Sequence, residues 1–320
     1  MKLTSEILTV RLSQPFGISR GVKTAAEVLR VRITDGENTG LGEAVPYARY
    51  QDSCEIALSQ ITTLPREFTR ANLMNLLPAG SARNAVDAAL IDLQSKQNGV
   101  AAWELLGLPE PKPVSMCFTI SLQSTEAMIA ETAKNSHLPV LKIKLGGSDD
   151  KRVILGIAKA APGAKLIVDV NEGWSLEDLQ DMIPVLVDSG VQLLEQPLPA
   201  HLDSQIASID CPIPLCADES ISPGMKISEV SRAYSFVNLK LDKSGGLSNA
   251  LTQLSEARGL GFGVMVGCMV GTSLAMAPGF LLAQQADFVD LDGFLYVAKD
   301  FQPSMKFQDG ILSAPLGLWG

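Results

Sequence analysis

Histidine and cysteine are scarce in this sequence. The two histidines are His137 and His201, and the five cysteines are Cys54, Cys117, Cys211, Cys216 and Cys268. The cysteines are odd in number and scattered, and no CxxC occurs, so a zinc cluster and a disulfide framework are both disfavoured. Reduced thiols are the simplest interpretation, and they predict a cytoplasmic protein.

Positive charge and membrane-like segments are also lacking. The chain has 26 Lys and Arg against 35 Asp and Glu, so we expect no nucleic acid among its partners. Its first residues alternate between apolar and polar types and do not form the apolar stretch of a signal peptide. Residues 259–286 carry no formal charge, but several glycines and Pro278 interrupt them. This segment therefore predicts a strand followed by a helix, and we expect no contact with a membrane.

The chain is long enough for a barrel and a small partner domain, and its pattern changes at the Pro-rich stretch 108–113. Before that stretch, strand-like alternation is followed by helical spacing. The strand-like segments are 6–16, 26–34 and 41–46, and the clearest helical segment is 81–98. Gly99 follows that segment directly, as expected of a helix end. We predict that residues 1–112 form a small α+β domain.

After residue 113 the pattern becomes a strand followed by a helix, repeated along the chain. The expected strands lie at 114–121, 140–146, 165–170, 191–196, 213–219, 236–242, 263–269 and 288–293. Eight strands separated by amphipathic segments predict a parallel α/β barrel over residues 113–299. A doubly wound sheet is the alternative, but the even spacing and the lack of a Gly-rich phosphate turn favour the barrel.

Ionisable residues stand at the ends of consecutive predicted strands. They are Lys142 with Lys144, Asp169, Glu195, Asp218 with Glu219, Lys240, and Asp290 with Asp292. From Lys144 to Lys240 the successive groups are 22 to 26 residues apart, about one strand–helix unit. They therefore reach the same end of the barrel, where barrel enzymes place their chemistry. One such residue alone is more simply a helix cap, whereas five consecutive strands that end in this way indicate a site.

The residue types at these positions suggest a metal-assisted proton transfer. Three carboxylates on adjacent strands suit Mg²⁺, whereas zinc would favour His or Cys. Lys142 and Lys144 lie on one face of their strand, and two close ammonium groups beside a divalent cation disfavour protonation. We expect their pKa values to fall toward neutrality, so that a lysine acts as a base. The metal would stabilise the enediolate that remains after removal of an α-proton.

The motifs that carry these residues resemble the enolase superfamily, and within it the muconate-lactonizing-enzyme-like subgroup. They are LKIKLGG (141–147), IVDVNEGW (167–174), LLEQPL (193–198), CADES (216–220) and NLKLDKSGG (238–246), in family order and spacing. The resemblance implies a TIM-like (β/α)7β barrel. It also implies an α+β capping domain that comprises residues 1–112 and is completed by the C-terminal tail 300–320.

The resemblance also implies roles for individual residues. The ligands of one Mg²⁺ would be Asp169, Glu195 and Asp218, with Glu219 and Asn171 beside them. Lys144 and Lys240 would be acid and base on opposite faces of the substrate. Lys142 would hold the substrate carboxylate and lower the pKa of Lys144. Thr119, Cys268 and Met269 are implied as further substrate contacts.

The last strand resembles the dipeptide epimerases, the L-Ala-D/L-Glu epimerase family, through the sequence Asp290-Leu-Asp292-Gly. In that family the two carboxylates bind the α-ammonium group of a dipeptide, and an acidic pair is suited to a cationic substrate end. A turn or a helix cap is the simpler interpretation of such a pair. The resemblance predicts an isomerase that inverts the C-terminal residue of a dipeptide by two-lysine 1,1-proton transfer, with a role in peptidoglycan recycling.

The sequence leaves the substrate side chain and several rival activities open. The loop 18–27 has Lys23 where L-Ala-D/L-Glu epimerases have an arginine, with Arg20 nearby, and a lysine lacks the bidentate fork of arginine. The rivals are an o-succinylbenzoate synthase, an N-acylamino-acid racemase, a cycloisomerase of a dicarboxylate, and a metal-binding barrel without catalysis. A homo-oligomer is also possible.

Overall fold

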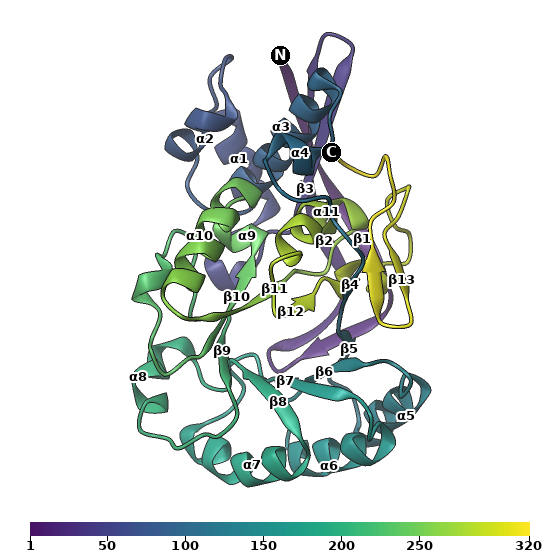
Figure 1. The fold of residues 1–320 in the computed structure, drawn as a ribbon, viewed down its shortest axis with the longest axis vertical. Helices are drawn as coiled ribbons and strands as arrows, with labels where there is room; N and C mark the ends of the chain where they lie inside the picture. Colours follow the sequence, from purple (N-terminus) through teal and green to yellow (C-terminus); the bar gives the residue numbers. More distant parts are fainter.

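The computed structural model describes residues 1–320 and contains a cap of sheet and helices above a barrel (Figure 1). The cap sheet is antiparallel, in the order β1 (Lys2–Ile18), β2 (Gly21–Asp35), β3 (Asn38–Ala44). The cap helices are η1 (Ala48–Tyr50), α1 (Cys54–Thr62), α2 (Arg70–Leu76), α3 (Ser81–Asn98) and α4 (Ala102–Leu105). The strands and the long helix expected from the sequence are confirmed.

Helix α3 packs directly on β3 because two glycines of that strand have no side chain. A Cβ on Gly40 would lie 2.0 Å from the carbonyl oxygen of Ala89, and one on Gly42 would lie 2.0 Å from that of Ala85. Gly99 caps the helix in the left-handed conformation, with φ of 64°. The helix and the sheet thereby share one apolar core.

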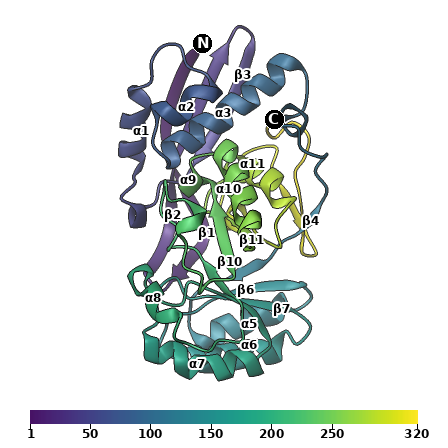
Figure 2. The same cartoon turned by 60° about the vertical axis from the view of Figure 1, so that its left-hand side comes forward.

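Strands β1 and β2 form a ribbon that is much longer than β3, and its tip extends from the cap to the barrel. The purple ribbon descends toward the barrel in both views (Figure 1, Figure 2). Close to the tip at Gly21, the backbone N–H of Leu122 donates to the carbonyl of Gly17 at 2.9 Å. Farther up the ribbon, Leu12 forms a β-bridge with Val297. The ribbon tip is therefore placed against the barrel by backbone contacts.

The barrel is an eight-stranded sheet in which all paired neighbours are parallel. Its strands are β5 (Phe118–Ile120), β6 (Val140–Lys144), β7 (Lys165–Asp169), β8 (Val191–Glu195), β9 (Leu215–Ala217), β10 (Phe236–Lys240), β11 (Gly263–Gly267) and β12 (Phe288–Asp290). The order runs from β12 to β5 without a break, and the backbone N–H of Cys117 donates to the carbonyl of Val289 where the two ends meet. The predicted barrel is confirmed, and the doubly wound sheet is wrong.

Helices follow the barrel strands and lie outside them. They are α5 (Thr125–Lys134), α6 (Asp150–Ala160), α7 (Leu176–Asp188), η2 (Ala200–Leu202), α8 (Asp203–Ile206), η3 (Ile227–Glu229), α9 (Leu241–Ser244), α10 (Leu247–Gly259), α11 (Ser273–Ala283) and η4 (Asp292–Tyr296). Figure 1 shows α5, α6 and α7 in an arc around the outer side of β5 to β8. The charge-free segment 259–286 forms β11 and α11, as predicted. None of the helices is both long and apolar enough to cross a bilayer.

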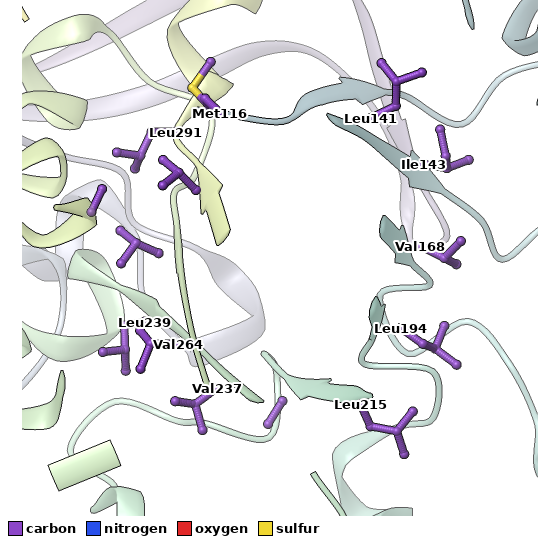
Figure 3. Packing of buried hydrophobic residues seen from close by; sticks show 14 of the residues in the cluster. Met116, Leu141, Ile143, Val168, Leu194, Leu215, Val237, Leu239, Val264 and Leu291 are labelled. Carbon is purple, nitrogen blue, oxygen red and sulfur yellow. The ribbon is translucent and has the colours of Figure 1, made fainter. Parts of the chain in front are cut away.

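Alternation along the barrel strands separates apolar packing from the charged groups. Figure 3 shows apolar side chains, among them Leu141, Ile143 and Val168, pointing outward from the ring of strands. Lys142 stands between Leu141 and Ile143, and Lys144 follows Ile143. Because side chains alternate along a strand, both lysine side chains point into the barrel. The same strands that build the outer core therefore aim their charged residues at the barrel mouth.

The first expected barrel strand, 114–121, is divided between two sheets, which corrects the prediction. Residues 114–115 form β4 (Val114–Ser115), which joins β13 (Lys306–Gln308) and β14 (Ile311–Ser313) in a separate antiparallel sheet. The backbone N–H of Met116 donates to Gly310 of that sheet, whereas that of Cys117 donates to Val289 of the barrel. The chain thus changes partners within two residues, and only β5 joins the barrel.

The C-terminal residues contact the cap. The carbonyl of Gly320 accepts from the backbone N–H of Ala102 at 2.9 Å, and the indole N–H of Trp319 donates to the carbonyl of Ala88 at 3.1 Å. Both chain ends lie at the cap end of the molecule (Figure 1). The domain boundary near residue 112, between α4 and β4, stays a prediction.

Candidate active site

The structure brings the charged strand ends together at one mouth of the barrel. Five carboxylates and four lysines meet there, all of them buried: Asp169, Glu195, Asp218, Asp290 and Asp292, with Lys142, Lys144, Lys240 and Lys243. The strand register aligns three of them, because Lys144 pairs with Asp169, and Asp169 pairs with Glu195, across adjacent parallel strands. Residues far apart in the sequence therefore share one layer.

Lys142 is the central cation of this layer. Its ammonium lies 3.0 Å from Asp169, 2.7 Å from Glu195 and 2.6 Å from Asp290. Burial lowers the pKa of Lys142, but these three carboxylates outweigh it and raise the pKa well above its usual range. The pKa of Lys142 is thus raised in this arrangement of side chains, and its fall toward neutrality beside a divalent cation stays a prediction. The spacing of charged residues at the strand ends does not reveal that three carboxylates surround the ammonium of Lys142.

Lys144 and Lys240 stand on opposite sides of the barrel. They end β6 and β10, which are separated by three strands on one side of the ring. Lys144 donates to Asp169 at 2.5 Å, and Lys240 donates to Asp218 at 2.7 Å. Burial lowers the pKa of Lys240, and Asp218 with Glu195 raises it well above its usual range. Two amines thus approach the same space from opposite faces.

The carboxylates differ in their proton affinity. Burial together with the charge of Asp169 raises the pKa of Glu195 to about 7, against the opposing effect of Lys142. Burial also raises the pKa of Asp169, but Lys142 and Lys144 outweigh it and hold the pKa below its usual range. The pKa of Asp218 is lowered in the same way, by Lys240 and Lys243.

Two residues of this site were missing from the sequence-based set. Lys243 donates to the carbonyl and to Oδ1 of Asp218, at 2.6 and 2.7 Å, and Asn238 donates to Glu195 at 2.7 Å. Asn238 lies two residues before Lys240, so strand alternation could have found it. Lys243 lies on the short helix α9, one turn after Lys240, where no strand periodicity applies.

Glu219 and Asn171 form a second layer that is tied to the ribbon tip. Asn171 donates to Glu219 at 3.1 Å, and its backbone N–H donates to Asp169. Arg20 donates to Glu219 at 2.7 Å and to the carbonyl of Asn171 at 2.7 Å. It also lies 3.3 Å from Glu172. Arg20, predicted as a substrate-binding residue, is therefore engaged in holding the ribbon tip on the barrel.

Lys23 remains at the surface of the ribbon tip. Its ammonium lies over the ring of Tyr47, 4.3 Å from the ring centroid, and Tyr47 also accepts from Arg20 at 3.4 Å. The loop 18–27, which contains Lys23 and Arg20, is thus in contact with Tyr47. Lys23 makes no salt bridge, so its charge is available.

Asp290 and Asp292 have different surroundings although they are two residues apart. Asp290 accepts from Lys142 at 2.6 Å and from the thiol of Cys117 at 3.3 Å. Asp292 accepts from the backbone N–H of Thr119 at 2.8 Å and lies 3.4 Å from the hydroxyl of Tyr296. Thr119 contacts Asp292 through its backbone N–H, and the predicted contact of Thr119 with a substrate stays a prediction.

Cys268 and Met269 follow β11 beside this pair. A Cβ on Gly293 would lie 3.1 Å from Cys268 Sγ and 2.5 Å from the carbonyl of Met269, so the strand end packs against η4 without a side chain between them. Burial raises the pKa of Cys268 well above its usual range, and Asp290 adds to this effect. The Cys268 thiol is therefore neutral, and it lines the site without a charge.

The oxygen atoms at the mouth suit a hard cation, although the side chains do not converge on one as they stand. No three His, Cys, Asp or Glu side chains are placed to hold a metal ion, because lysine ammonium groups take their oxygens. Several buried acceptors nevertheless lack a hydrogen-bond donor: Glu195 Oε2, Glu219 Oε2, Asn171 Oδ1 and Asn238 Oδ1. The ammonium of Lys142 lies 2.7 Å from Glu195 Oε2, but its geometry does not make a hydrogen bond to this oxygen. Unpartnered oxygens of this kind fit Mg²⁺.

Two family models match the two parts of the chain. Residues 2–107 match the mandelate racemase / muconate lactonizing enzyme N-terminal domain, and residues 125–318 match the enolase C-terminal domain-like model. The chain belongs to the mandelate racemase / muconate lactonizing enzyme family. This confirms the family predicted from the sequence motifs, and the cap and the barrel follow its two domains.

Two relatives within this family cover almost the whole chain. An N-acetyl-D-glutamate racemase from Pseudoalteromonas sp is 44% identical over 299 residues, which are 91% of this chain and 94% of that protein. An L-Ala-D/L-Glu epimerase from Escherichia coli (strain K12) is 38% identical over 307 residues, which are 94% and 96% of the two chains. Both relatives are isomerases of glutamate-containing compounds by name.

Solved structures of family members agree with the fold. An enolase family member from Agrobacterium tumefaciens, described as homologous to dipeptide epimerases and containing sodium and L-Ala-L-Glu, superposes with a TM-score of 0.96 at 41% identity and covers 99% of both chains. A dipeptide epimerase from Cytophaga hutchinsonii, complexed with Mg and D-Ala-L-Val, gives 0.89 at 26% identity and covers 98% and 94%.

Proposed function

We propose that this protein is a Mg²⁺-dependent epimerase that inverts the α-carbon of the C-terminal residue of a dipeptide such as L-Ala-D/L-Glu. The observation that carries the proposal is the placement of Lys144 and Lys240 on opposite sides of one barrel mouth, around buried carboxylates. A single base would remove and return a proton on the same face. Two amines on opposite faces allow removal on one and delivery on the other, which inverts the centre.

The position of each lysine determines the role that we propose for it. Whichever of Lys144 and Lys240 is unprotonated takes the α-proton into its Nζ, and the other gives a proton to the opposite face of the same carbon. Lys142, fixed by three carboxylates, places a positive charge where the substrate carboxylate would bind. Charge complementarity thus binds the substrate and lowers the cost of the anion formed on deprotonation.

Asp169, Glu195 and Asp218 are the proposed metal ligands. When bound, Mg²⁺ would supply positive charge that weakens the lysine–carboxylate pairs and stabilises the enolised substrate carboxylate. The donor chemistry supports this assignment, because the three side chains offer only oxygen and stand on adjacent strands. Solved family members with Mg or sodium support it as well.

Asp290 and Asp292 are the proposed site for the ammonium group of the dipeptide, and Lys23 for an acidic side chain. Names of relatives that contain L-Ala and Glu support both assignments. A role in peptidoglycan recycling is part of this proposal, and the L-Ala-D/L-Glu unit in the name of the Escherichia coli relative supports it. Five free cysteines support a cytoplasmic location. A homo-oligomer stays a prediction.

Racemisation of an N-acylated amino acid is the second candidate, because the N-acetyl-D-glutamate racemase is 44% identical to this chain. It requires the same lysines and metal, and it differs from the dipeptide reaction only at the amino end of the substrate. An o-succinylbenzoate synthase has no comparable support.

Proton exchange tests the proposal directly. The enzyme would be incubated with Mg²⁺ in D₂O and a library of dipeptides and N-acylated amino acids, and mass spectrometry would report a gain of one mass unit. We expect gain in L-Ala-L-Glu and its D-Glu epimer, and none after removal of Mg²⁺ with EDTA. Gain in no dipeptide would overturn the main proposal, and gain in no compound at all would leave a binding protein without catalysis.

A further inference from the structure

Helix α3 of the cap contacts the short helix α9 of the barrel directly (Figure 2). The guanidinium of Arg83 donates to the carbonyls of Ser244 and Gly245, at 2.8 and 2.9 Å. The next residue, Asn84, donates to Asp242 of α9 at 2.9 Å. Arg83 is buried, and all its hydrogen bonds go to backbone carbonyls. Since no carboxylate accepts from it, the cap fixes the end of α9 at a cost in desolvation.

The chain that follows α9 has no side chains where α3 approaches it. A Cβ on Gly245 would lie 2.5 Å from Arg83 Nε, and one on Gly246 would lie 2.5 Å from Asp87 Oδ2. Both glycines have positive φ, of 74° and 113°, which other residues rarely adopt. Helix α9 has only four residues, too few to be stable by itself. Its position therefore depends on the contact with α3.

Helix α9 carries Lys243 to the proposed metal ligand Asp218. The Lys243 ammonium donates to the carbonyl of Asp218 at 2.6 Å and to its Oδ1 at 2.7 Å, while Lys240 donates to Oδ2 at 2.7 Å. Lys243 is only 2% exposed, and its ammonium lies 5.9 Å from the centroid of the Tyr50 ring of the cap. One ammonium that binds both the backbone and the side chain of Asp218 restricts rotation of this carboxylate. It thereby determines which oxygen faces Lys240 and the barrel mouth.

We propose that Lys243 is a positioning residue that fixes the Asp218 carboxylate for Mg²⁺, and that Arg83 of the cap sets the place of Lys243. The inference rests on the proposed function, in which Asp218 is a metal ligand. Lys243 acts through Asp218, and Arg83 acts through α9, so neither residue touches the substrate. The cap then contributes to the metal site as well as to the loops over the barrel mouth.

The affinity for Mg²⁺ distinguishes positioning from a simple effect of charge. Lys243→Met removes the ammonium, and the Kd for Mg²⁺, measured by isothermal titration calorimetry without substrate, should rise about 10-fold or more. If Lys243 contributed charge alone, the same variant should bind Mg²⁺ more tightly, because a nearby cation opposes the binding of another. An unchanged or lower Kd in Lys243→Met would therefore overturn the inference.

Arg83→Lys tests the contribution of the cap without a change of charge. Lysine lacks the fork that binds two carbonyls, so the Kd for Mg²⁺ should rise about 3- to 10-fold. This variant decides the matter if Lys243→Met does not fold, because an unchanged Kd in it would also overturn the inference. In the double variant, the Kd should be close to that of Lys243→Met alone, since both residues act in one chain of contacts. Multiplication of the two single effects would contradict that chain.

Asp87→Asn is the matched control on the same face of α3. Asp87 lies one turn after Arg83 and accepts from the backbone N–H and the hydroxyl of Ser248, at 3.0 and 2.6 Å, so it holds α10 rather than α9. Asp87→Asn should lower the Tm but change the Kd for Mg²⁺ less than about 2-fold. A rise equal to that of Arg83→Lys would overturn the assignment to Arg83. A wild-type protein that binds no Mg²⁺ would instead contradict the proposed function.

Discussion

The barrel strands and the cap loops contribute different parts of the same site. The strand residues are buried and held by ion pairs, and Lys142 has three carboxylate partners, Asp169, Glu195 and Asp290. The loop residues are more exposed, and Lys23 is held only by the ring of Tyr47. The difference indicates that the strands define the reaction and that the loops define which side chain is accepted.

Arg20 connects the two regions. It is on the ribbon tip of the cap, yet it binds Glu219 and Glu172 of the barrel. Burial lowers the pKa of Arg20, but Glu219 and Tyr47 together outweigh it and raise the pKa above its usual range, so the guanidinium remains charged. A residue of the cap thus stabilises the charged residues of the barrel.

The largest effect is expected for the strand lysines. Lys144→Ala and Lys240→Ala should each lower epimerisation by about 10³-fold or more, because each removes a proton donor or acceptor on one face. NMR in D₂O can follow the two epimers separately. Each variant should retain exchange from only one of them, since the remaining lysine still reaches one face.

Lys159→Ala is the control for the loss of a lysine, because Lys159 is exposed on α6, away from the barrel mouth. Full activity in either Lys144→Ala or Lys240→Ala would refute the two-base assignment. Equal exchange from both epimers in each variant would show that one lysine serves both faces.

An intermediate effect is expected for the connection between the regions. Arg20→Ala leaves Glu219 buried without its cation, so kcat/KM should fall about 10- to 100-fold for dipeptide and N-acyl substrates alike. Arg20→Lys should restore part of the activity, because one charge remains without the fork. A loss confined to substrates with an acidic side chain would mean that Arg20 binds substrate rather than Glu219.

The strand part of the site was predictable because it depends on periodicity. Lys144, Asp169, Glu195, Asp218 and Lys240 follow from the ends of apolar strands at regular spacing, and the structure brings them together, buried, at one mouth of the barrel. The role of Arg20 was not predictable, since its partners lie about 150 and 200 residues away in the sequence and no local pattern connects them. The pairing of Lys142 and the division of 114–121 between two sheets likewise depend on long-range contacts.

A smaller effect is expected for Lys23. Lys23→Ala should raise KM for L-Ala-L-Glu about 10-fold with little change in kcat, and should leave dipeptides with an apolar C-terminal residue unaffected. Lys23→Arg should lower KM, because the guanidinium binds a carboxylate through two hydrogen bonds. Steady-state kinetics with L-Ala-L-Glu and L-Ala-L-Leu would measure both. Equal changes in KM for the two dipeptides would show that Lys23 does not determine the preference for an acidic side chain.

The smallest effect concerns Asp242, which holds the chain just after β3 of the cap against the barrel. Its Oδ1 accepts from the backbone N–H of Val45 at 3.1 Å and from Asn84 at 2.9 Å. Burial is the main cause that raises the pKa of Asp242 to about 7, so the folded state holds a proton that the unfolded chain releases near pH 4. The corresponding stability is present in full below about pH 4 and is lost as the pH rises through about 7.

Asp242→Asn keeps the acceptor and cannot ionise. It should therefore be more stable than wild type by about 1–2 kcal/mol at pH 8, with a difference that shrinks toward pH 5. Chemical unfolding at the two pH values would measure this difference, and a difference that does not depend on pH would show that Asp242 is ionised in both states.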